Sequence, residues 1–262
     1  MATRKEAESG ERELNKATVR VLQVLSSFAS DTPGHGVTEL AQALGMTKNM
    51  TYRALSTLVE QGYLMREPEG TRYQLGYRVL ELQQPLVVDP DFRGLAAPYV
   101  QRLHALTGES IGLVVRAGDH CVLIDGIETR KHGVYRIRIG SLFSLWGPAT
   151  GRVLLAGDDD AAIADYIMRH DLDRKEVEEG IARIRKDGFA RVARSTPPQM
   201  VSVAFPVRDI DGRLHGSISV GGPRERFEAQ LERQLAEIKA IVAELNHRSR
   251  LFPADDAGSE LH

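Results

Sequence analysis

The stretch Val37–Leu64 reads VTELAQALGMTKNMTYRALSTLVEQGYL and predicts the fold of the N-terminal third of the chain. Apolar residues recur at helical spacing on both sides of Gly45, first as Leu40, Ala41 and Leu44 and then as Ala54, Leu55, Leu58 and Val59. Gly45 suits the left-handed cap that commonly ends a helix, and Thr47 can accept hydrogen bonds from the free N–H groups of the next one. Two short helices joined by such a turn are typical of a helix-turn-helix, which places its second helix in a DNA groove.

The flanking residues predict the rest of a winged helix. Residues 14–29 place apolar side chains on one face of a supporting helix, which the sequence DTPGHG ends. β-type runs at Tyr63–Arg66 and Arg72–Leu75 flank the turn sequence EPEGT and predict a hairpin. We therefore expect a winged helix-turn-helix domain over residues 14–76, a mobile arm at 1–13 before it, and a linker helix at 77–88 after it.

The remaining sequence alternates between helical and strand-like runs. Helices are predicted at 92–106, 149–156, 159–170, 174–187 and 224–250, and strands at 110–116, 120–127, 134–139, 189–194, 201–208 and 214–220. Strands, then helices, then strands again favour an α+β domain built on a central antiparallel sheet. This second domain is expected over residues 89–250, with a disordered tail at 251–262.

Composition narrows the class of protein. Apolar residues make up 42% and charged residues 27% of the 262 residues, as in soluble globular proteins. The single cysteine, Cys121, cannot form an internal disulfide, no Cys/His spacing suits a metal, and no cofactor motif is present. There is neither a membrane-spanning run nor the apolar core of a signal peptide, so a cytoplasmic location is expected.

The predicted second helix of the motif offers candidate DNA contacts. If Thr51 and the apolar residues face inward, Asn49 and Arg53 face outward. Arginine and asparagine can bond bidentately to guanine and adenine, whereas Lys48 and Ser56 suit phosphate contacts. A polar face on a short helix is usually only solvated, but its place within an ordered winged helix favours DNA binding. The full set of predicted DNA contacts comprises Thr47, Lys48, Asn49, Tyr52, Arg53, Ser56, Arg66 and Arg72.

The second domain offers candidates for a small-molecule site. The loop GSLFSLWGPATG gathers Leu142 and Trp146 beside glycines ahead of a predicted helix, which could line an apolar pocket. Ser217 and Ser219 share one face of a predicted strand, and which face belongs to the core stays open. Core packing is the alternative explanation for the aromatic loop.

Several ordered motifs carry a family resemblance. The stretches RVLQVLSSFASD, VTELAQALGMTKNMTYRALSTLVEQGYLMREPEGTRYQLGYRVLEL, GSLFSLWGPATGRVLLA and SVAFPVRDIDGRLHGSISVGGP resemble the IclR (isocitrate lyase regulator) family of bacterial transcription factors over residues 14–250. The resemblance implies a GAF-like effector-binding domain and a homodimer, or dimer of dimers, on double-stranded, partly palindromic operator DNA. It implies effector contacts, which together with the loop residues are Leu142, Trp146, Ala149, Thr150, Met200, Ser202, Ser217 and Ser219.

This chain also departs from the family pattern. Val192, Ser195 and Ser202 stand where the family signature has an acid or serine, a glutamate and a cysteine or small residue. Leu142 and Trp146 replace residues that are commonly basic or histidine. Our hypothesis is therefore a small organic acid effector that is larger and either more apolar or aromatic, rather than a two- or three-carbon acid.

The protein is predicted to be an allosteric transcriptional regulator, in which the linker helix transmits effector binding to the DNA-binding domain. We expect a repressor of a catabolic operon; the alternatives are an activator of the same type, or a ligand-independent DNA-binding protein that uses its second domain only to oligomerise through the apolar stripe of residues 224–250. An enzyme is not expected. Although His120 adjoins Cys121, neighbouring residues on a strand point to opposite faces, so the imidazole is badly placed to activate the thiol.

Overall fold

The computed structural model describes residues 14–29, 32, 34–68, 70–87, 90–131, 136–193 and 199–248. The chain divides into two compact units, Met1–Leu86 and Val87–His262. The predicted arm at 1–13 and tail at 251–262 lie outside the described residues, as does Ser195.

The first unit is a helical domain with a small sheet. Its elements are α1 (Lys16–Ser26), β1 (His35–Gly36), α2 (Val37–Ala43), α3 (Lys48–Glu60), β2 (Leu64–Arg66) and β3 (Arg72–Leu75). The antiparallel strand order is β1-β3-β2, so the predicted hairpin gains a third strand that the sequence did not indicate. Its core consists of Val24, Phe28, Leu40, Ala54, Leu55, Leu58, Leu64 and Tyr73.

Local capping explains the helix boundaries in this unit. Asn15 Oδ1 accepts hydrogen bonds from the N–H groups of Ala17 and Thr18 and starts α1. Gly45 adopts a φ of +63° between α2 and α3, in the left-handed region that glycine enters without a steric penalty. Thr47 Oγ1 accepts from Met50 N at 3.3 Å and starts α3. The predicted helix-turn-helix is therefore confirmed, including the turn and the cap.

The second unit is built on one six-stranded antiparallel sheet. The helix α4 (Arg78–Val87) ends the first unit, and α5 (Pro90–Thr107) is the first helix of the second. The strands are β4 (Ser110–Ala117), β5 (His120–Ile127), β6 (Leu142–Ser144), β7 (Ala190–Ala193), β8 (Met200–Arg208) and β9 (Leu214–Pro223), in the order β6-β5-β4-β9-β8-β7. The remaining helices are α6 (Ala149–Ala156), α7 (Asp160–Arg169), α8 (Arg174–Asp187) and α9 (Arg224–Arg248).

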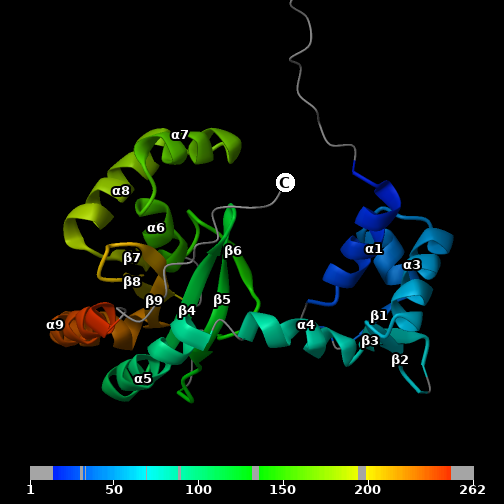
Figure 1. Ribbon diagram of the computed structural model, residues 1–262, viewed down its shortest axis with the longest axis horizontal. Coiled ribbons are helices and arrows are strands. Elements are labelled where there is room, and N and C mark those ends of the chain that lie inside the picture. Colours follow the sequence, from blue (N-terminus) through cyan, green and yellow to red (C-terminus); the bar gives the residue numbers. More distant parts are fainter. Residues whose placement is uncertain are drawn as a thin grey trace, which may run out of the picture. The chain divides into compact units, whose positions relative to one another are not determined.

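Helices cover both faces of this sheet. Figure 1 shows α5 and α9 together on one side and α6, α7 and α8 on the other. Phe227 and Ile238 of α9 share a buried cluster with Ile218 and Val220 of β9. Ala149 and Val153 of α6 are buried against the opposite face. Both faces are therefore core, and the predicted α+β class with an N-terminal winged helix-turn-helix and a central antiparallel sheet is confirmed.

One predicted strand was wrong. Residues 132–135 lie outside the described part of the chain, and Arg136–Arg138 are not in a strand. The edge strand is instead β6, within the stretch expected to be a loop. The edge strand lies at β6 because the chain turns at Gly140. This glycine has a φ of +87°, and its N–H donates to Leu123 O at 2.7 Å. This turn brings Leu142–Ser144 alongside β5, where it can pair.

Candidate functional site

The outward face of α3 carries polar side chains that are not used within the domain. Lys48, Asn49 and Arg53 are exposed, and none makes a side-chain hydrogen bond, ion pair or cation–π contact among the described residues. Thr51, Ala54, Leu55 and Leu58 are buried, as the spacing predicted. The structure thus leaves an amide, an ammonium and a guanidinium free at the helix surface.

Three further predicted DNA contacts lie together between α3 and the hairpin, namely Tyr52, Ser56 and Arg66. The Arg66 guanidinium lies over the rings of Tyr52, at 5.9 Å, and of Tyr73, at 5.2 Å from the centroid. Its Nη2 donates to Tyr73 Oη at 2.9 Å. The pKa of Tyr52 is lowered, first by a hydrogen bond with Ser56 and then by Arg66. Tyr73 was missed by sequence reasoning because its role comes from packing across the hairpin.

Arg72 is directed elsewhere. Its guanidinium bonds to the Gly34 carbonyl oxygen and lies 3.4 Å from Glu39 Oε2. A hydrogen bond with His35 is the main reason why the pKa of Glu39 lies below its usual value, with the Gly36 N–H next in importance. Arg72 therefore ties β3 to the beginning of α2, which sets it apart from the free side chains of α3.

Six of the eight predicted effector contacts lie on one side of the sheet, between α6 and strands β8 and β9. They are Ala149, Thr150, Met200, Ser202, Ser217 and Ser219, all of them buried. Ser217 is fully buried, and its Oγ donates to Thr150 O at 3.3 Å. Ser219 Oγ donates to Gly112 O at 3.4 Å. Ser202 makes no side-chain hydrogen bond within the described ranges, which leaves its hydroxyl available.

Three glycines extend this side of the sheet, and we call them the glycine floor: Gly112, Gly126 and Gly221. Gly112 is paired with both Gly126 and Ser219, and Gly221 with Ser202, so all five face the same way. A Cβ on Gly126 would lie 3.0 Å from Ile137 Cγ2 and only 2.3 Å from Ile111 O. Ile137 therefore lies over the floor. Glycines inside predicted strands were a usable signal for close approach by another group, and sequence reasoning missed it.

The other two predicted effector residues lie apart from these six. Leu142 is on the edge strand β6 and is 62% exposed. Trp146 belongs to the core between α6 and α8, where a Cβ on Gly180 would come within 2.5 Å of its Cη2. The Arg152 guanidinium lies 4.2 Å from the centroid of the Trp146 ring. Trp146 is therefore packed in the core, which was the alternative explanation for this aromatic loop.

The thiol of Cys121 has no catalytic environment. Burial raises its pKa to about 11, although a hydrogen bond with Thr150 acts in the opposite direction. His120 is exposed, whereas Cys121 is fully buried. Among the residues with described positions, no three His, Cys, Asp or Glu side chains gather as a metal site requires. Within the same residues no helix has the length and apolarity needed to cross a membrane.

Comparison with known proteins agrees with this architecture. Residues 17–68 match the IclR helix-turn-helix domain, and residues 85–247 match the family described as bacterial transcriptional regulator IclR C-terminal. The DNA-binding transcriptional repressor YiaJ of Escherichia coli is 27% identical, over 99% of this chain and 95% of that protein.

Solved structures share the fold. An IclR transcriptional regulator from Alicyclobacillus acidocaldarius superposes with a TM-score of 0.74 at 22% identity, covering 90% of this chain and 99% of that one. An IclR homolog from Microbacterium hydrocarbonoxydans, complexed with 4-hydroxybenzoate, gives a TM-score of 0.72 at 17% identity, covering 90% and 99%. With both of its domains matched, the chain belongs to the IclR family of bacterial transcriptional regulators, which are DNA-binding proteins and not enzymes.

Proposed function

We propose that the chain binds an operator with α3 in the major groove and the β2–β3 hairpin against the adjacent backbone. The observation that carries this proposal is the free face of α3, where Lys48, Asn49 and Arg53 have no partner among the described residues. Arg53 and Asn49 would read bases and Lys48 would contact phosphate, together with Thr47 at the helix start. Arg66 would set the hairpin, and Arg72 would act indirectly by holding α2. A partly palindromic operator implies a homodimer or a dimer of dimers in the bacterial cytoplasm.

For the effector we propose the space over the glycine floor, bordered by Ser202 and Ser219. Glycines remove side chains from this part of the sheet beneath Ile137, and two hydroxyls supply polar contacts to an otherwise apolar surface. The N-terminus of α6, where Pro148 provides no side-chain cap, would offer N–H groups to a carboxylate. Ala149 and Thr150 begin that helix, whereas the buried Ser217 would position it.

The proposed effector is a small organic acid, with an aromatic acid as the preferred class. Val192, which pairs with Ser202, stands where the family signature has an acid or serine and makes the border of the site less polar. The proposal is supported by a solved relative of this fold that is complexed with 4-hydroxybenzoate. The effector would act by binding one arrangement of the DNA-reading domains better than another, with α4 as the connection. We propose repression of a catabolic operon, a role supported by the repressor YiaJ among the relatives.

A footprint on the DNA upstream of the protein's own gene tests this proposal. The full-length protein is titrated alone and with 4-hydroxybenzoate, glyoxylate or pyruvate. We expect a protected, partly palindromic site whose occupancy changes with the aromatic acid only. A response restricted to glyoxylate and pyruvate would overturn the effector class, and the absence of a protected site would show that this DNA carries no operator for the protein.

The ligand-independent alternative relied on an apolar stripe of α9 as an oligomerisation surface, and this stripe is buried. The apolar stripe of α9 was its candidate oligomerisation surface, yet Phe227, Leu231, Ile238, Ile241, Val242 and Leu245 are buried within their own domain. A thermal-shift screen of organic acids separates the two functions, because a ligand that binds only the folded protein raises its melting temperature. A broad panel without any shift would favour the alternative.

A further inference from the structure

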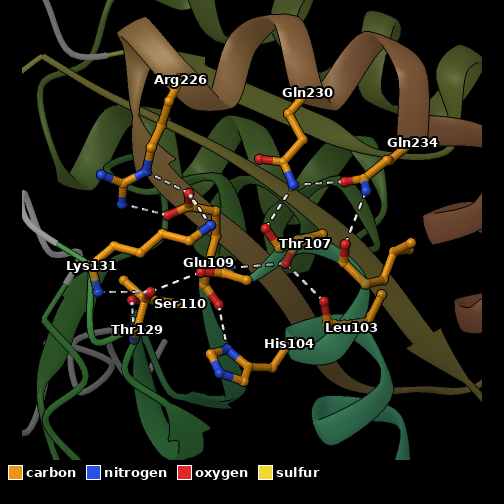
Figure 2. Close-up of polar contacts among 12 residues, drawn as sticks. Leu103, His104, Thr107, Glu109, Ser110, Thr129, Lys131, Arg226, Gln230 and Gln234 are labelled. Carbon is orange, nitrogen blue, oxygen red and sulfur yellow. Dashed lines mark hydrogen bonds and ion pairs between the residues drawn. The ribbon is translucent and has the colours of Figure 1, made fainter.

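The helix α5 is fastened to α9 at its C-terminal end. Gln230 Nε2 donates to the carbonyl oxygen of Thr107, the last residue of α5, at 2.6 Å. Just beyond the helix, the fully buried carboxylate of Glu109 accepts two hydrogen bonds from Arg226, Nε to Oε1 at 2.6 Å and Nη2 to Oε2 at 2.8 Å. Figure 2 shows Arg226, Gln230 and Gln234 of α9 directed at this part of the chain. This end of α5 is therefore firmly held.

The beginning of α5 is held by other contacts, which reach the sheet. Phe92 is buried, and a Cβ on Gly216 of β9 would lie only 2.7 Å from Phe92 Cζ, so the ring packs directly on that strand. The next residue, Arg93, donates from Nε to Asp125 Oδ2 of β5 at 2.7 Å. The side chains of this ion pair are 32% and 22% exposed, so solvent screens their attraction less than that of a fully exposed pair. Arg93 thus ties the start of α5 to β5.

The same carboxylate holds the backbone of the glycine floor. Asp125 Oδ1 accepts the N–H of Gly126 at 2.8 Å, while Oδ2 accepts from Arg93. Gly126 pairs with Gly112, and Ile137 lies over it. Because successive residues of a strand face opposite sides of a sheet, Asp125 faces α5 while Gly126 faces the proposed effector site. One carboxylate therefore connects the two sides of the sheet.

The strand β5 is irregular at this point. Leu113 pairs with Asp125 and Val114 pairs with Leu123, so Ile124 is an extra residue in β5. Such a bulge interrupts the ladder and commonly re-aims a side chain next to a functional site. The pairing with β4 therefore constrains Asp125 less than a regular ladder would, and a ligand pressing on the neighbouring glycine can displace its carboxylate.

We propose that Arg93 is a positioning residue, whose ion pair with Asp125 couples effector binding over Gly126 to the beginning of α5. In the element order α5 comes directly after α4, so this is the end of the helix nearer in sequence to the DNA-binding unit. The other end is fixed to α9, which leaves the beginning of the helix as the part that responds. The coupling rests on the proposed function, because it takes the effector to lie over the glycine floor. The connection between α5 and β5 belongs to the free protein, so the two can be tested separately.

Hydrogen–deuterium exchange of the full-length protein without ligand tests the connection. Arg93→Met is compared with Arg102→Met, which removes an equal charge from the same helix and breaks an ion pair with Glu244 of α9. We expect the amides around Gly126 to exchange about fivefold faster in Arg93→Met and within about twofold of wild type in Arg102→Met. The connection would be overturned by no acceleration in Arg93→Met, by equal acceleration in both variants, or by acceleration throughout the second domain.

The ratio of operator affinities with and without 4-hydroxybenzoate tests the coupling. In Arg93→Met and in Asp125→Asn this ratio should lie about fivefold closer to one than in the wild type, although titration shows that 4-hydroxybenzoate still binds. The double variant should lose no more than either single variant, because both remove the same contact. A wild-type ratio in Arg93→Met, or an equal loss in Arg102→Met, would refute the coupling.

The two measurements separate the failure of this coupling from the failure of the proposed function. If the wild-type protein responds to none of the acids while exchange near Gly126 still depends on Arg93, the proposed effector class fails and the connection between α5 and β5 stands. If 4-hydroxybenzoate changes operator affinity equally in all the variants, the effector class stands and the coupling through Arg93 fails.

Discussion

The guanidinium of Arg66 lies 5.9 Å from the centroid of the Tyr52 ring and so connects the hairpin to α3. The same guanidinium donates a hydrogen bond to Tyr73 within the hairpin. Arg66 therefore adds a surface contact between the hairpin and α3 to the core packing of Leu64 and Tyr73.

A double-mutant cycle on the free energy of unfolding should reveal this connection. Tyr52→Ala, Arg66→Ala and the double variant are expected to show a coupling free energy of about 0.5–1 kcal/mol, the usual strength of an exposed cation–π contact. Urea unfolding followed by circular dichroism measures it. Additive losses would mean that the two residues act independently.

Arg53→Ala should weaken operator binding by about 1–3 kcal/mol and relax specificity at one position, as the loss of a base contact does. Arg20→Ala is the matched control, since Arg20 is exposed on α1 and has no side-chain contact within the described part of the chain. It should change affinity by less than about 0.5 kcal/mol. Equal losses in both variants would point to net charge rather than base reading.

Gly112→Ala should lower effector affinity about tenfold, equivalent to about 1.4 kcal/mol, and leave operator binding without effector unchanged. The new methyl group would lie 3.0 Å from Leu123 Cδ1 and 3.2 Å from Ser219 Oγ, and so would occupy the proposed site. Isothermal titration with 4-hydroxybenzoate measures the effect. Gly94→Ala in α5, where no atom lies within 4 Å of the new methyl group, is the control. Wild-type affinity in Gly112→Ala would exclude the glycine floor from the effector site.

Gly180→Ala should destabilise the second domain by about 1–3 kcal/mol through overpacking against Trp146, whose Cη2 would lie 2.5 Å from the added Cβ. Gly94→Ala also replaces a glycine inside a helix and should instead stabilise by about 0.5–1 kcal/mol. Thermal unfolding followed by Trp146 fluorescence reports directly on the contact. A higher melting temperature in both variants would show that helix propensity outweighs the ring contact.

Cys121 should resist alkylation by iodoacetamide at pH 8 and react readily in urea, because burial raises the pKa of the folded thiol to about 11. The folded pKa lies above the ordinary thiol value of 9.0, so this contribution to stability is complete below pH 9 and is lost as the pH rises toward 11. Cys121→Ala should remove that part of the alkaline destabilisation and leave operator binding intact. Rapid alkylation of the native protein would contradict the buried position.

The DNA-reading half was predictable because its determinants are local. Helical spacing buried Thr51 and Leu55 as expected, and Gly45 and Thr47 cap their helices through bonds to residues a few positions away. The short strand β1 was missed because a two-residue pairing has no period of its own. Likewise, no local pattern marks Arg72 as the partner of Glu39, 33 residues away.

The second domain was less predictable because its faces are decided by what packs on them. Alternation in β9 separated Ser217 and Ser219 from Ile218 and Val220 without indicating which pair is buried. In the folded domain both pairs are buried, because α5 and α9 cover one face of the sheet and α6 covers the other. Trp146 stays a predicted effector contact; the structure packs its ring against Gly180 of α8.

The sequence by itself determined the family, the two kinds of domain and the outward face of α3, because each follows from short-range spacing, capping and ordered motifs. Only the tertiary structure decided which side chains are free and which are already bound. Glu109 and Arg226 meet across 117 residues, and the glycine floor joins three strands. Such contacts depend on how distant segments pack, and a linear pattern of residues carries no record of that packing.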